Sequence, residues 1–162
     1  MRPTTARGQA MVEFAVILLP IMLVLVGIIQ FGFLFAAYVG TSNATREAAR
    51  AGTIYFYQAA DTQSVNDASR CAAVLAAASA SFDQTVPGRF AATCSTANGD
   101  GADLVISYPD ASTCSASSRT GCQIHVRLTY HTPVFVPLVA AFLNPDGDDT
   151  IPLSATVTMV MN

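Results

Sequence analysis

Residues 14–39 read FAVILLPIMLVLVGIIQFGFLFAAYV, an apolar run without a charged residue in which Gln30 is the only strongly polar side chain. As an α-helix the run would reach about 39 Å, which exceeds the hydrocarbon core of a bilayer, about 30 Å thick. A removable secretory signal has a shorter apolar region followed by a small-residue cleavage site. Ala44 offers such a residue, but the length of the run favours a single membrane-spanning helix.

The bulk composition agrees with a membrane anchor. The chain has 162 residues, of which 52% are hydrophobic and only 12% are charged. This is too apolar for an ordinary soluble domain of that length. The net charge of -3 provides no basic surface for nucleic acid, so we expect no nucleic-acid partner.

The flanks of the apolar run predict its orientation. Arg2 and Arg7 precede the run, and no acidic residue lies before Glu13. Positive residues favour the cytoplasmic side, so we expect a cytoplasmic N-terminus and an outer C-terminal domain. Pro20 lies inside the predicted span, where packed membrane helices tolerate proline, and we expect it to kink the helix.

Four cysteines lie on the C-terminal side of the run, at Cys71, Cys94, Cys114 and Cys122. None forms a CxxC pair and the chain has only two histidines, which disfavours a structural zinc site. An even number of cysteines outside the cytoplasm predicts two disulfides. Of the three possible pairings we favour Cys71–Cys94 and Cys114–Cys122, because each closes a short interval. The alternative is that some thiols are free and buried.

The outer region reads as one helix followed by three strands. Asp61 or Thr62 can cap a helix over residues 65–82, and Pro87-Gly88 ends that segment. Residues 93–101 and 110–121 are rich in Ser, Thr, Asn and Gly and read as loops. The positions at helical spacing predict a buried stripe, which consists of Val65, Ala68, Ala72, Leu75, Ser79 and Phe82.

Three later segments alternate apolar and polar residues, as half-buried strands do. They contain, in order, Leu104, Ile106 and Tyr108; Ile124, Val126, Leu128 and Tyr130; and Leu153, Ala155, Val157, Met159 and Met161. The expected fold is α+β, with a small antiparallel sheet packed on the extended N-terminal helix. The Cys114–Cys122 disulfide would clamp the loop between the first two strands.

Few residues in this chain suggest catalysis or ligand binding. The GxSxG, HExxH, P-loop and GxGxxG motifs are absent, so we expect no enzyme activity, no cofactor and no small-molecule substrate. His125 and His131 lie on the polar face of the second strand, where we expect them to be solvated. Asp146 and Asp148, in a turn over residues 144–149, could bind Ca²⁺ weakly, although a plain turn explains the same residues.

A second apolar run, PVFVPLVAAFL at residues 133–143, is too short to cross a membrane. We expect it to lie in the core or to form a contact surface for the membrane or a partner.

Glu13 is the most informative residue, because a carboxylate beside an apolar run is costly and is a functional candidate by default. Residues 7–14 read RGQAMVEF, so a short basic leader ends in Gly8 and a glutamate follows five residues later. This resembles prepilins of the Flp/Tad type, which a membrane prepilin peptidase cuts after the glycine. The resemblance implies a cut between Gly8 and Gln9, which would make Glu13 and Phe14 the fifth and sixth residues of the mature chain.

The spacing also has a physical reason. The cut would create a cationic amine at Gln9, and Glu13 lies one helical turn away, where it can neutralise that amine in its own chain or a neighbouring subunit. In type IV pilins generally, the glutamate is thought to make this pairing during assembly. The alternative is that Glu13 reaches the membrane interface or stays protonated without such a role.

Residues 44–52, ATREAARAG, are similar to the TadE-like branch of pseudopilins, the minor subunits of tight-adherence pili. Phe14 stands where the major Flp pilins typically carry tyrosine, and the chain is long for a major pilin, which both fit the minor branch. Arg46 and Arg50 are four residues apart on one helix face and could contact lipid phosphates or acidic residues of a partner. A solvated helix face is the alternative.

The resemblance implies a leader over residues 1–8, an extended helix over residues 9–57 and an outer domain over residues 58–162. It also implies a single-pass protein of the bacterial inner membrane with a periplasmic outer domain, which could instead end up on the pilus outside the cell. The implied partners are a prepilin peptidase, other pilins and membrane lipid, and the implied role is in adhesion. The competing hypothesis is an uncleaved signal-anchored envelope protein with an outer binding domain.

Overall fold

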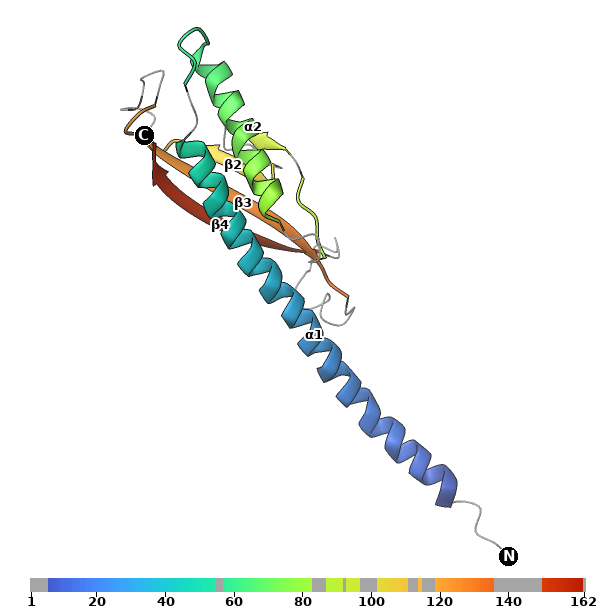
Figure 1. The fold of residues 1–162 in the computed structure, drawn as a ribbon. Coiled ribbons are helices and arrows are strands. Elements are labelled where there is room, and N and C mark those ends of the chain that lie inside the picture. The colour runs from blue at the N-terminus through green and yellow to red at the C-terminus, as the bar shows by residue number, and fades with distance from the viewer. Residues whose placement is uncertain are drawn as a thin grey trace, which may run out of the picture.

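A long helix carries a small α+β domain along its C-terminal half (Figure 1). The computed structural model describes residues 6–54, 57–82, 87–91, 93–96, 102–110, 114, 119–135 and 150–161. The elements are α1 (Ala6–Thr53), α2 (Gln63–Ser81), β1 (Cys94–Ser95), β2 (Leu104–Ser107), β3 (Gln123–Pro133) and β4 (Thr150–Val160).

The N-terminal half of α1 stands alone. Each residue from 8 to 26 is exposed although most are apolar, and the stretch Gly8–Thr53 is long and apolar enough to cross a membrane. An exposed apolar surface of this extent needs a nonpolar environment or a partner. The structure therefore agrees with a single-pass anchor.

The C-terminal half of α1 buries one narrow stripe against the outer domain. Small residues dominate this stripe, which contains Gln30, Ala37, Thr41, Ala44, Thr45, Ala48, Ala49 and Gly52. At Gly52 a Cβ atom would lie only 2.6 Å from Ile124 Cδ1 and 3.0 Å from Val74 Cγ2. Gly52 is therefore a point of close packing between α1, α2 and β3.

Helix α2 begins at the predicted place but buries a different face. Thr62 is its N-cap, because its hydroxyl accepts a hydrogen bond from the Val65 amide. The predicted stripe is wrong: Val65, Ala68, Ala72 and Ser79 are exposed, and only Leu75 and Phe82 pack partly on the core. The buried residues are Asn66, Arg70, Cys71, Val74 and Ala78. Alanine occurs all around α2, so the polar contacts of Asn66 and Arg70 and the Cys71 disulfide decide which face is buried.

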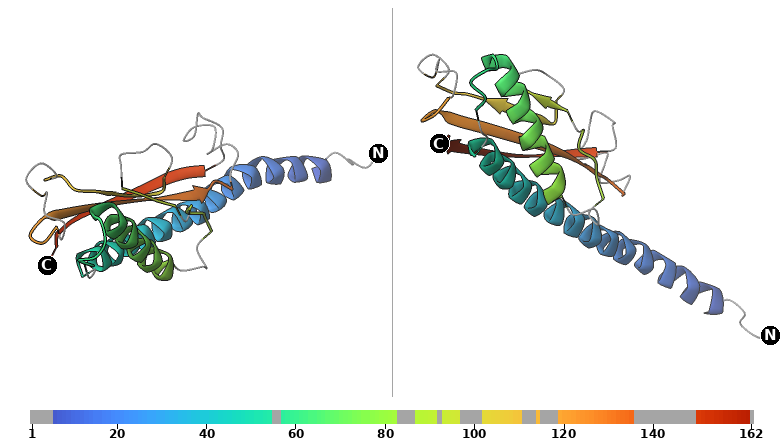
Figure 2. Two further views of the ribbon diagram at one scale, coloured as in Figure 1. Left: turned by 90° about the horizontal axis from the view of Figure 1, so that it is seen from above. Right: turned by 45° about the horizontal axis from the view of Figure 1, so that its top comes forward.

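The sheet has the order β1-β2-β3-β4, and α1 and α2 cover one of its faces (Figure 2). β3 pairs antiparallel with β2, for example Ile106 with Val126, and with β4, for example Val126 with Val157. Alternate residues of β3 point to the helices, and Ile124, Val126 and Leu128 are fully buried there. This confirms the predicted α+β fold and its antiparallel strands.

A short strand, β1, adds a parallel pairing at the edge of the sheet, between Cys94 and Leu104. It lies in a segment that the sequence predicted to be a loop. The Cys71–Cys94 disulfide ties β1 to α2, and the Cys114–Cys122 disulfide closes the connection between β2 and β3. Both predicted pairings are thus confirmed.

Candidate functional site on the N-terminal helix and its junction with the outer domain

The predicted processing and assembly residues lie on the first exposed turns of α1. Gly8 has open space around it, since an added Cβ atom would meet nothing within 4 Å. The Gln9 Nε2 amide donates a hydrogen bond of 3.2 Å to Glu13 Oε1, one helical turn later. The Glu13 carboxylate therefore reaches the Gln9 side chain, and Phe14 beside it is 66% exposed. Its pairing with the α-amine of Gln9 stays a prediction.

Helix α1 continues through Pro20 without a break (Figure 1). Pro20 removes one backbone donor from the helix ladder but is compatible with helical φ. The kink expected at this residue stays a prediction.

Gln30 joins the anchor helix to the outer domain. Its Nε2 donates to the Pro133 carbonyl at 3.1 Å, and its Oε1 accepts from the Phe135 amide at 2.8 Å. The Phe33 and Phe135 rings meet edge to face, with centroids 5.9 Å apart. The end of β3 is thereby fixed beside the middle of α1.

One sign of this junction could be read from the sequence, since Gln30 is the only strongly polar side chain of the apolar run. The first residues of the apolar run 133–143 contact α1 of the same chain, and Phe135 is 55% exposed. A contact of this run with a membrane or a partner stays a prediction. Residues 136–143 fall outside the part of the chain that the structure describes.

The two arginines of residues 44–52 are both exposed, but they differ in their contacts. The Arg50 guanidinium binds the Glu47 carboxylate, with Nη2 and Oε1 2.7 Å apart. The hydrogen bond from Arg50 lowers the pKa of Glu47, and the same bond raises the pKa of Arg50. Arg50 is therefore engaged within its own helix, which leaves Arg46 as the better candidate for a partner contact.

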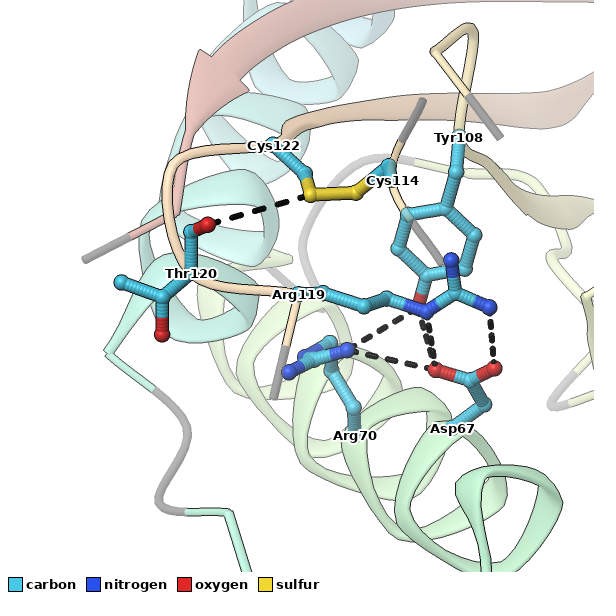
Figure 3. Close-up of a disulfide and its surroundings, with 7 residues drawn as sticks. All are labelled: Asp67, Arg70, Tyr108, Cys114, Arg119, Thr120 and Cys122. Carbon is cyan, nitrogen blue, oxygen red and sulfur yellow. Dashed lines mark hydrogen bonds and ion pairs between the residues drawn. A yellow bond between two sulfur atoms is a disulfide. The ribbon is translucent and has the colours of Figure 1, made fainter. Parts of the chain in front are cut away.

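A cluster of charged side chains joins α2 to the loop before β3 (Figure 3). Arg119 binds Asp67 through two hydrogen bonds of 2.8 and 2.7 Å, and its guanidinium carbon lies 3.7 Å from the centre of the Tyr108 ring. Arg70 and the Tyr108 hydroxyl also donate to Asp67, at 3.3 and 3.1 Å. Arg119 has a φ of 53° and is 9% exposed, so its backbone and side chain are both held in place.

The cluster changes the pKa of Tyr108 and of Arg119. Burial raises the pKa of Tyr108, and this effect outweighs the hydrogen bond from Arg70, which lowers the pKa. The hydrogen bond to Asp67 raises the pKa of Arg119. The neighbouring Cys114–Cys122 disulfide closes the loop that carries Arg119, so covalent and ionic links together fasten this loop to α2. The sequence did not indicate the cluster, because its members lie far apart along the chain.

The two histidines of β3 have different surroundings. His131 Nε2 lies 3.0 Å from Asp103 Oδ1, and the Ala91 amide donates to the other carboxylate oxygen. The expectation that His131 is solvated is therefore wrong: it is half-buried and links β3 to the start of β2. His125 is half-buried on the same strand face.

Among the residues that the structure describes, no group of three or more His, Cys, Asp or Glu side chains could hold a metal ion. Asp146 and Asp148, the calcium candidates, fall outside those residues.

Comparison with known proteins agrees with the TadE-like resemblance of the N-terminal helix. Residues 8–50 match the model of the family described as TadE-like protein. No curated protein and no solved structure matches the chain. The family match begins at Gly8 and ends at Arg50, so it covers the exposed apolar half of α1 and the buried stripe as far as Ala49 but not the sheet.

Proposed function

The N-terminal helix of this chain is TadE-like, and from that premise we propose that the protein is a minor pilin that takes part in assembling a tight-adherence pilus. The family implies a protein associated with that pilus system. Processing, assembly and adhesion are the finer part of the proposal. The observation that carries it is the Gly8–Gln9–Glu13 arrangement at the start of an exposed apolar helix.

In this proposal α1 is inserted in the inner membrane, and a prepilin peptidase then cuts the chain between Gly8 and Gln9. Two features support the cut. Gly8 lies on an exposed turn of α1, where an added Cβ atom would meet nothing within 4 Å. From Phe14 to Val26 the residues are apolar and exposed, and they can remain in lipid while the leader leaves.

Glu13 then positions the subunit. Its carboxylate already reaches the Gln9 side chain, so the new cationic amine of Gln9 would form within about one helical turn of it. An opposite charge nearby stabilises both groups in the low dielectric of the membrane edge. The same carboxylate can pair with the amine of a neighbouring subunit when two copies of α1 lie side by side.

The outer domain supplies a rigid body for contacts with other pilins. Two disulfides and the Asp67–Arg119 pair limit its motion, and Arg46 is exposed on α1 beside it. An exposed arginine on a rigid helix suits an acidic residue of a partner subunit.

Substitution of Glu13 tests this function. We expect Glu13→Ala to insert into the membrane as the unmodified protein does but to block pilus formation, because the amine loses its counter-ion. Glu47→Ala is the matched control, since Glu47 is a glutamate of the same helix whose partner is Arg50. Membrane fractionation and electron microscopy of sheared pili measure the two outcomes. Normal pili from the Glu13→Ala strain would contradict the proposed role.

A further inference from the structure

Aromatic residues on α1 are confined to two places within the charge-free part of the helix. Phe14 stands at its start, no aromatic residue occurs from 15 to 30, and four follow within residues 31–38. Phe14 and Phe31 are about 26 Å apart along a helix, which is close to the thickness of a hydrocarbon core. Tyrosine and tryptophan side chains gather at the two interfaces of a membrane, and Tyr38 belongs to the outer group. The distance from Phe14 to Phe31 matches the length of one membrane span.

The outer group of aromatic residues surrounds α1 on two sides. Phe31, Phe35 and Tyr38 share one helix face and are 70%, 63% and 55% exposed. Phe135 lies on another side of the helix, against Phe33, and is also largely exposed. We call Phe31, Phe35, Tyr38 and Phe135 the aromatic collar.

Charge alone does not place the bilayer along α1. The helix has no charged residue between Glu13 and Arg46, a stretch of about 48 Å, whereas a hydrocarbon core needs about 30 Å. Burial decides between the possible placements. From Gln30 onward one side of α1 is covered by the outer domain, with Gln30, Ala37 and Thr41 nearly inaccessible. The core can therefore surround the helix completely only below Gln30.

The hydrogen bonds at Gln30 suit a nonpolar environment. An unpaired amide, carbonyl or N–H at membrane depth is costly, because no water is present there to bond it. Here both polar atoms of the Gln30 amide are paired, and they pair the Pro133 carbonyl and the Phe135 N–H in return. The segment that carries Phe135 is thus fixed at the level of residues 30–33, with these two backbone groups paired.

We propose that the aromatic collar lies in the outer leaflet of the bilayer that α1 crosses, so that the hydrocarbon core extends from about Phe14 to about Phe31 and the outer domain rests on the membrane through Phe135. The partner of this surface is lipid. This inference shares one premise with the proposed function, namely that α1 crosses a bilayer. It shortens the span of 14–39 that the apolar run predicts.

The absence of tryptophan from the sequence gives a direct test. Phe135→Trp makes a protein with a single tryptophan, which is reconstituted at low density in phosphatidylcholine vesicles containing lipids brominated either near the headgroup or near the chain ends. We expect blue-shifted emission that lipids brominated near the headgroup quench most strongly. Phe31→Trp should show the same preference.

Two further variants complete the test. Val160→Trp, at the far end of β4 and 57% exposed, should lose no intensity to brominated lipid and should be quenched by aqueous acrylamide. Leu23→Trp, in the middle of the exposed helix, should be quenched most by lipids brominated near the chain ends. If Leu23→Trp escapes quenching, the membrane span itself is wrong, and with it the proposed function.

If Leu23→Trp is quenched but Phe135→Trp behaves like Val160→Trp, the collar is not in lipid and the inference is overturned. Emission from Phe135→Trp that neither brominated lipid nor acrylamide quenches would overturn it as well, because a protein neighbour would then cover the collar.

Discussion

At the scale of single residues, Asp67 binds two arginines of the outer domain, Arg70 and Arg119. Arg119, Arg70 and the Tyr108 hydroxyl all donate to its carboxylate, and the Asp67 and Arg119 side chains are only 13% and 11% exposed. A pair of this kind adds little stability over a nonpolar pair of the same shape, but removal of one partner leaves a charge buried without compensation. The cluster therefore makes the loop that carries Arg119 sensitive to a single substitution.

Asp67→Asn should lower the free energy of unfolding by about 2–3 kcal/mol, because Arg119 and Arg70 keep their charge and lose the carboxylate charge that balances it. Urea unfolding of the full chain in detergent micelles measures the change. Glu47→Gln is the matched control, because it breaks an ion pair whose two side chains are exposed and should have no measurable effect. Equal effects of the two substitutions would show that burial of the cluster does not matter.

The raised pKa of Tyr108 predicts a loss of stability at alkaline pH. The folded state holds the phenol proton more tightly than the unfolded state does, so stability is complete below the usual pKa of 10.0 and falls as pH rises through the higher pKa of the folded state. Tyr108→Phe should weaken this pH dependence, and burial of Tyr130 should leave a remainder. Unfolding midpoints measured on both sides of pH 10 test the effect, and parallel curves for the two proteins would contradict it.

Contacts between neighbouring residues could be predicted from the sequence, whereas contacts across the fold could not. Gln9 and Glu13 are one turn apart in any helix, so their contact follows from the spacing alone. Asp67 and Arg119 meet only because β2, β3 and the Cys114–Cys122 disulfide bring them together. The pairing of Gln30 with residues 133–135 depends in the same way on the length and register of β3.

At the scale of secondary structure, α1 packs closely against Val74 and Ile124 at Gly52. Gly40, twelve residues earlier in the same helix, has nothing within 4 Å of an added Cβ atom. Alanine substitutions at the two glycines can therefore be compared: the one at Gly40 changes helix propensity alone, and the one at Gly52 also changes packing.

Gly40→Ala should stabilise the protein by up to about 1 kcal/mol, because alanine favours the helix. Gly52→Ala gains the same propensity but must displace Ile124 in the core, and we expect it to be less stable than Gly40→Ala by about 1–3 kcal/mol. Urea midpoints in detergent micelles measure the difference. Equal midpoints would mean that α1 does not pack closely at Gly52.

The strands were easier to predict than the buried face of α2. Alternation of apolar and polar residues fixes both the type and the inward face of β3, since its side chains have a period of two. In α2, alanine is common on all sides, so hydrophobic periodicity carries little information. The buried face is set by Asn66, which bonds the backbone at Gln58, and by Arg70 and Cys71, and each of these contacts depends on residues outside the helix.

At the scale of the whole molecule, the long apolar helix follows from composition, whereas the assembly of the α+β domain on it does not. The exposed apolar half of α1 could be predicted from the absence of charge over residues 14–45. The proposed height of the membrane along α1 could not be predicted from the sequence, because it depends on where the outer domain begins to cover the helix.

The central claim is that this chain is a prepilin-type subunit that is cut between Gly8 and Gln9. Determination of the N-terminal residue of the protein, purified from membranes of cells that contain the tight-adherence pilus system, tests that claim most directly. The account predicts a mature chain that begins at Gln9, and a Gly8→Ala variant that accumulates uncut. An intact N-terminus at Met1 in the unmodified protein would contradict the account and favour an uncleaved signal-anchored envelope protein.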